Sequence, residues 1–154
     1  MVTWLVIANS TAASIYDITK PEYPGAHHDS HYKLVTELSH EKSRLKTSEL
    51  VDDKPGHYQG SGSSRGAYSS HTDAHENEIQ FFAKDIAHYL EAAREKNSFK
   101  QLILCAGPHF HGLLNHALSK QTALLVKKHI EKDYIPLSDK KLHDVIETIY
   151  KMPL

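Results

Sequence analysis

The sequence predicts a single α/β domain in which a mixed β-sheet packs against flanking helices. Its first 40 residues contain short apolar or alternating segments separated by polar turns, which is typical of strands. The second half alternates helical periodicity with short apolar runs, which is typical of helices packed on a buried sheet. A length of 154 residues suits one domain with its own core. The expected order is β-β-β-(long loop)-α-β-α-β-α.

Three strands are expected before the loop. Residues 3–8 are apolar and predict a buried strand, and a polar turn at 9–11 leads into the alternating segment 13–18. Together these two segments predict a β-hairpin. Residues 32–40 alternate in the same way and predict the third strand.

The expected loop covers residues 54–72. It contains four glycines and five serines and no acidic residue, and Lys54 and Arg65 give it a local charge of +2. A loop of this length inside a compact domain is usually functional or disordered. Its glycines would allow close backbone approach, and its tyrosines could stack on bases, so it is a candidate contact with RNA or phosphate. The alternative is a surface loop without such a role.

The clearest helix follows this loop directly. Asp73 is the expected N-cap, and Glu76 three residues later gives a pattern like a capping box. The helix is expected to end near Asn97. Apolar residues recur at helical spacing and predict one buried face: Ile79, Phe82, Ile86, Tyr89, Leu90 and Ala93.

Strands and helices alternate in the rest of the chain. Residues 101–106 form a continuous apolar run, which is typical of a strand buried on both faces, and Cys105 is expected in the core. Pro108 suits the first turn of a second helix. A last strand is expected near 126–133, and Ser138 is the expected N-cap of a third helix.

Composition excludes several classes of protein. A formal net charge of -1 argues against a protein that coats nucleic acid generally. The single cysteine excludes an internal disulfide and a zinc site built from several thiolates. The N-terminus has no basic region typical of a secretory signal, and no segment approaches the roughly 20 apolar residues of a membrane span. The sequence therefore predicts a cytoplasmic protein without membrane insertion.

Two groups of histidines are candidate sites. His71 and His75 are four residues apart, a spacing that puts two metal ligands on one helix face, although they also fit exposed residues at a helix start. His109 and His111 follow a buried strand at its carboxyl end, where ligands often bind α/β sheets, and either is a candidate acid, base or phosphate contact. Alternate residues at a helix start point apart, which argues against a joint role. The sequence predicts no metal and no cofactor.

Five patches lie along the chain in a characteristic order and spacing: Trp4–Ala8 with Ala13–Tyr16, Arg44–Leu45 with Glu49–Gly56, His75–Glu76 with Phe82–Ala83, Leu102–Leu114, and Ile130–Tyr134 with Leu137–Ser138. In this order and spacing they resemble the bacterial host attachment protein family. The fold of that family is similar to the middle domain of archaeal and eukaryotic peptide-chain release factors, an RNase H-like α/β arrangement. The resemblance therefore implies this fold and a relation to factors that act on stalled ribosomes.

The resemblance places the 54–72 loop where release factors carry a Gly-Gly-Gln tip that promotes hydrolysis of peptidyl-tRNA. This chain has no Gly-Gly-Gln, and its nearest piece is Gln59-Gly60-Ser61-Gly62. The resemblance therefore implies contact with the ribosome or tRNA rather than hydrolysis. The candidate nucleic-acid contacts are Arg44, Lys54, Tyr58, Gln59, Gly60, Gly62, Arg65, Gly66 and Tyr68.

Two other functions fit the same sequence. One is an interaction protein that contributes to bacterial attachment to host cells, through a protein partner or as a homo-oligomer. The other is a small metal-dependent hydrolase built on His71, His75 or His109.

Overall fold

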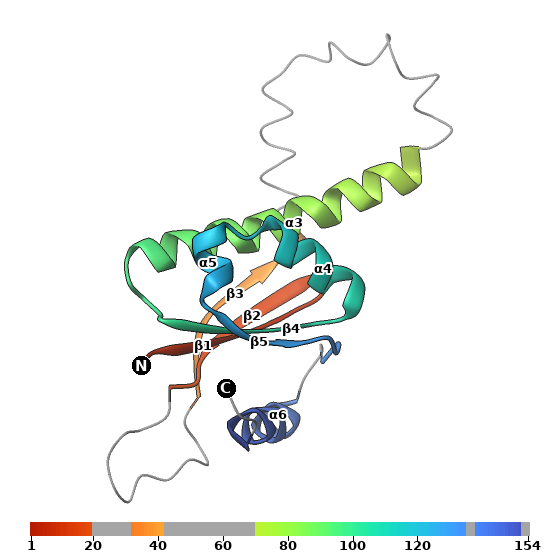
Figure 1. Ribbon diagram of the computed structural model, residues 1–154. Coiled ribbons are helices and arrows are strands. Elements are labelled where there is room, and N and C mark those ends of the chain that lie inside the picture. The colour runs from red at the N-terminus through yellow and green to blue at the C-terminus, as the bar shows by residue number, and fades with distance from the viewer. Residues whose placement is uncertain (20–31, 42–69, 135–137, 152–154) are drawn as a thin grey trace, which may run out of the picture.

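The computed structural model of the chain describes residues 1–19, 32–41, 70–134 and 138–151. These residues form a five-stranded mixed sheet with helices on both faces (Figure 1). This arrangement confirms the predicted α/β class and a single domain. Residues 54–69 of the predicted loop lie outside the described residues, and the predicted end of the loop at residue 72 is wrong, because residues 70–72 belong to the helix that follows.

Nine elements are described. The strands are β1 (Thr3–Ala8), β2 (Ala12–Asp17), β3 (Lys33–Ser39), β4 (Gln101–Ala106) and β5 (Val126–Ile130). The helices are α3 (Ser70–Glu95), α4 (Pro108–Ala117), α5 (Lys120–Leu124) and α6 (Asp139–Lys151).

The sheet combines an antiparallel half and a parallel half, in the order β3-β2-β1-β4-β5. β1, β2 and β3 pair antiparallel, and β1, β4 and β5 pair parallel. The predicted hairpin of β1 and β2 is confirmed, and the side chain of Asn9 accepts hydrogen bonds from the backbone N–H groups of Thr11 and Ala12, each at 2.9 Å. β1 is the central strand, and for this reason all six of its residues are buried.

The larger core lies between the sheet and α3, α4 and α5 (Figure 1). The rings of Trp4 and Phe99 pack here with centroids 5.0 Å apart, and those of Phe82 and Phe110 with centroids 6.0 Å apart. The predicted apolar face of α3 is confirmed. Its buried members are Ile79, Phe82, Ile86, Leu90 and Ala93, and Tyr89 is partly buried.

The opposite face of the sheet packs against α6. Leu142, Ile146 and Ile149 of the helix are buried against the sheet, and Cys105 is buried among them as predicted. The Tyr150 hydroxyl donates a hydrogen bond of 2.9 Å to the carbonyl of Ile18, which fixes the C-terminal half of α6 to the end of β2.

The ends of the helices follow local capping chemistry, with one exception. The end of α3 near Asn97 is confirmed: Asn97 has a φ of 58°, and the N–H of Ser98 donates to the carbonyl of Ala93 at 2.9 Å, which together form a Schellman motif. Ser138 caps α6 as predicted, since its hydroxyl accepts from the N–H of Lys141 at 3.3 Å. The prediction that Asp73 is the N-cap of α3 is wrong, because the helix begins a turn earlier and Asp73 lies inside it.

The last strand is shorter than predicted and follows a helix that the sequence did not predict. β5 ends at Ile130 rather than at residue 133, because Ile130 pairs with Cys105 and β4 ends one residue later. The unpredicted helix is α5, which has only five residues. Ser119 is its N-cap and accepts a hydrogen bond from the N–H of Thr122 at 3.1 Å.

Candidate functional site

Polar side chains gather where the parallel strands end. α4 begins directly after β4, with Gly107 as its N-cap and Pro108 in its first turn. Because β5 lies parallel and adjacent to β4, its last residues end at the same edge of the sheet. Ligands commonly bind α/β sheets at this carboxyl edge. We therefore take the histidines of α4 and β5 as the candidate functional site.

The centre of this site is a pair of histidines from the two elements. The Nε2 atom of His111, in α4, lies 2.9 Å from the Nδ1 atom of His129, in β5. The two rings meet edge to face, with centroids 4.9 Å apart and planes inclined by 74°. The His111 side chain is buried, whereas His129 is exposed. One of the two facing nitrogens therefore carries the shared proton, and solvent reaches the pair from the side of His129.

Glu131 stands on the other side of His111. Its Oε1 atom lies 3.8 Å from the Nδ1 atom of His111. Burial lowers the pKa of His111, and the neighbouring His129 lowers it further, while Glu131 acts in the opposite direction. His111 is therefore neutral at pH 7, since an ordinary histidine already titrates near 6.5.

His109 points away from this pair and joins a different helix. Its exposed ring places Nε2 at 3.1 Å from the Oε1 atom of Glu76, in the second turn of α3. This contact confirms the prediction that His109 and His111 point apart. It also brings the start of α3, which includes the last three residues of the 54–72 segment, to the carboxyl edge of the sheet.

The predicted pair His71 and His75 lies on α3, since the helix begins at Ser70. His75 is exposed, and the side chain of His71 is outside the described residues. Among the side chains that the structure describes, no group of three or more His, Cys, Asp or Glu residues is arranged to hold a metal ion. The hydrolase built on these histidines gains no support from the described residues.

All nine predicted nucleic-acid contacts lie outside the residues that the structure describes. They are Arg44, Lys54, Tyr58, Gln59, Gly60, Gly62, Arg65, Gly66 and Tyr68. They stay predictions, because no described contact tests them.

The sequence analysis did not find a second polar cluster, around Glu91 of α3. Its carboxylate accepts hydrogen bonds from the Arg94 guanidinium, from the Ser119 hydroxyl, and from the Thr122 hydroxyl at 2.6 Å. These bonds, with that of Arg94 the strongest, lower the pKa of Glu91 to about 2. Thr122 is completely buried, so the cluster fixes α5 to α3 and has a structural role.

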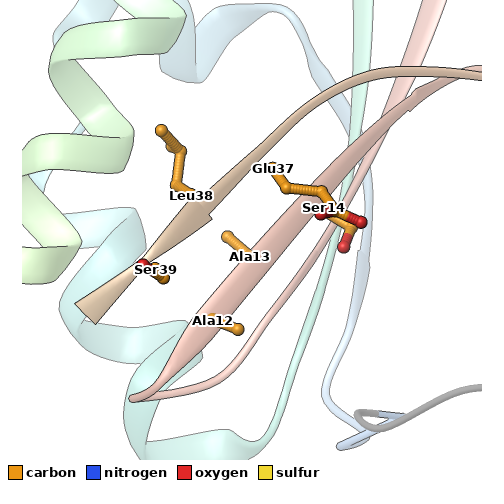
Figure 2. A pocket seen from close by; sticks show the side chains of 6 residues that line it. All are labelled: Ala12, Ala13, Ser14, Glu37, Leu38 and Ser39. Atoms are coloured by element: carbon orange, nitrogen blue, oxygen red, sulfur yellow. The ribbon is translucent and has the colours of Figure 1, made fainter. Parts of the chain in front are cut away.

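A shallow hollow lies on β2 and β3, at the antiparallel end of the sheet (Figure 2). Its volume of about 250 Å³ is below the roughly 300–1,000 Å³ that is usual for ligand pockets. Figure 2 shows Glu37 beside Ser14, and Leu38 directed toward the helices. Glu37 is the one titratable side chain in its lining, so the hollow lacks the convergent polar groups of a binding site.

The sequence of this chain matches the model of a known protein family. A family model described as "Protein required for attachment to host cells" matches residues 4–146. The chain belongs to this family. The match to the host attachment family includes β1 from Trp4 onward, all of the other described strands, the 54–72 segment, and the pair His111 and His129. No curated protein matches the chain. In the part of this host attachment protein that the structure describes, no helix is long and apolar enough to cross a membrane.

Proposed function

We propose that this member of the host attachment family contributes to the attachment of a bacterium to host cells. The observation that carries the proposal is the family match over residues 4–146, which covers nearly the whole chain. The match includes all of the described sheet except Thr3, so it concerns the fold as a whole rather than one short motif.

Attachment is tested by deleting the gene and measuring adherent bacteria. We expect adherence to fall in the deletion strain and to return when the wild-type chain is restored. Fractionation of the complemented strain then separates a direct adhesin, found on the cell surface, from an indirect role, in which the chain stays inside the cell. Normal adherence of the deletion strain would contradict the proposal.

At the molecular level, we propose that the 54–72 segment contacts the ribosome or tRNA. Lys54 and Arg65 supply charge with no acidic residue in the segment to neutralise it, and Tyr58 and Tyr68 supply rings for stacking. The segment leads into α3, whose second turn meets His109 at the carboxyl edge of the sheet. The proposal also rests on the resemblance to the release-factor middle domain. Peptidyl-tRNA hydrolysis is not part of it, because Gly-Gly-Gln is absent.

Co-sedimentation with ribosomes across a salt series tests this contact. Binding through phosphates weakens as salt rises, so we expect salt-sensitive binding that falls in a Lys54→Ala/Arg65→Ala variant. The matched control is Lys96→Ala/Lys120→Ala, which removes the same charge from two exposed described positions. If wild-type protein stays wholly in the free fraction, the RNA proposal fails while the attachment proposal stands. If both variants bind equally, the contact does not lie in the segment.

A further inference from the structure

The pair His111 and His129 combines a fixed nitrogen with an accessible one. His111 is 6% exposed and is held by the packing of α4 on the sheet, whereas His129 lies on the edge strand β5 and is exposed to solvent. Their facing nitrogens, Nε2 and Nδ1, are 2.9 Å apart. Neutral imidazole nitrogens at this distance either share a proton or bind a common ion.

We propose that His111 and His129 together bind one divalent transition-metal ion of the kind that prefers imidazole in square-planar or octahedral geometry, Cu²⁺ or Ni²⁺. Imidazole nitrogens that lie about 2.0–2.1 Å from one ion and at right angles to each other are about 2.9 Å apart. The observed separation matches this spacing. Tetrahedral Zn²⁺ would need the two nitrogens about 3.4 Å apart, so the pair fits it less well.

The second nitrogen of His111 supports the same assignment. Nδ1 faces the carboxylate of Glu131 at 3.8 Å, which favours a proton on Nδ1 and leaves the lone pair on Nε2, toward His129. At 3.8 Å the carboxylate acts on the ring electrostatically rather than through a hydrogen bond. A neutral His129 can carry its proton on Nε2 instead, and this tautomer leaves the lone pair of Nδ1 free for the ion.

The protein supplies two ligands to this ion rather than a closed cage. Among the described residues no third His, Cys, Asp or Glu completes a metal-binding group, so water fills the other positions on the open side of His129. The bound ion would join α4 to β5, an edge strand that pairs only with β4 among the described strands. Binding should therefore raise the melting temperature of the chain.

The test uses the full chain, purified without an affinity tag and treated with a chelator that is then removed. Titration with NiCl₂ or CuCl₂ is followed by calorimetry and by the NMR signals of the histidine rings, since Cu²⁺ and octahedral Ni²⁺ are paramagnetic. Because the chain has 13 histidines, the variants decide where the ion binds. His129→Ala removes an exposed ligand and should fold normally. The control variant His116→Ala removes an exposed histidine from α4, the helix that carries His111.

We expect one binding event that is lost in His129→Ala and kept in His116→Ala. In the wild type, the ring signals of His111 and His129 should broaden before those of the other histidines. Glu131→Gln should weaken binding, because the neutral amide no longer favours the proton on Nδ1 of His111 electrostatically. Equal stoichiometry and affinity in the wild type and His129→Ala, or unchanged ring signals of His111 and His129, would overturn the proposal.

Discussion

Replacing Phe82 and its neighbour Phe81 by alanine should separate the two faces of α3. Both residues lie in the same helix, and both substitutions remove the same aromatic ring. Phe82 is 0% exposed, whereas Phe81 is 53% exposed. The Phe82 ring packs against those of Phe110 and His40, with centroids 6.0 Å and 5.8 Å away. The pair of variants therefore differs in burial while intrinsic helix propensity is held constant.

The expected loss for Phe82→Ala is about 3–5 kcal/mol of unfolding free energy, because a buried aromatic side chain is removed and leaves a cavity. Phe81→Ala should change the same quantity by less than about 0.5 kcal/mol. Domains of ordinary stability have unfolding free energies of about 5–15 kcal/mol, so the loss expected for Phe82→Ala is a large fraction of the total.

Urea unfolding followed by circular dichroism measures both variants. With a slope of about 2 kcal/mol per molar urea, the midpoint of Phe82→Ala should fall by about 1.5–2.5 M, and that of Phe81→Ala should hardly move. Equal losses in the two variants would refute the assignment of Phe82 to the core and Phe81 to the surface. A small loss in both would show that α3 contributes little to the larger core.

Three further outcomes are expected. The thiol of Cys105 should not react with a disulfide reagent in the native protein, because burial raises its pKa to about 12. It should react once urea unfolds the chain. Rapid reaction in the native protein would contradict the burial of Cys105. The pKa of Glu91 falls from 4.5 to about 2 on folding, so its contribution to stability is present above pH 4.5 and is lost as the pH drops toward 2. Thermal unfolding of Glu91→Gln should show a weaker pH dependence in that range, and an unchanged curve would count against the bonds to this carboxylate. Thr122→Val should lower the unfolding free energy by about 1–2 kcal/mol, because the buried hydroxyl no longer donates a hydrogen bond to Glu91. Thr148→Val, on the exposed side of α6, should lower it by less than about 0.5 kcal/mol. Equal losses in urea unfolding would show that the hydrogen bond from Thr122 to Glu91 does not stabilise the fold.

Local pattern was enough to predict most elements of the sheet and the main helix. The apolar run at 101–106 and the helical spacing of Ile79, Phe82 and Ile86 are properties of neighbouring residues, and they reflect burial directly. The sequence did not predict α5, because five residues are too few to show a helical repeat of apolar residues. Its Ser119 and Thr122 bond to Glu91, which is about 30 residues away in the chain, and such a partner cannot be read from local sequence.

The start of α3 and the end of β5 show the limits of local signals. Asp73 has the chemistry of an N-cap, but no proline or glycine lies between Ser70 and Asp73 to prevent one more turn. Residues 131–133 have no strand beside them because β4 ends at Ala106, so their pattern alone could not extend β5.

The sequence by itself determined the α/β class, the hairpin, the buried faces of the main elements and the family to which the chain belongs. These follow from hydrophobic periodicity, from capping residues and from the order of the sequence patches, all of which are local properties of the sequence. Only the tertiary structure decided that His111 meets His129 and that His109 instead meets Glu76. The physical reason is that the parallel pairing of β4 and β5 and the packing of α3 beside α4 bring together side chains that are 18 and 33 residues apart.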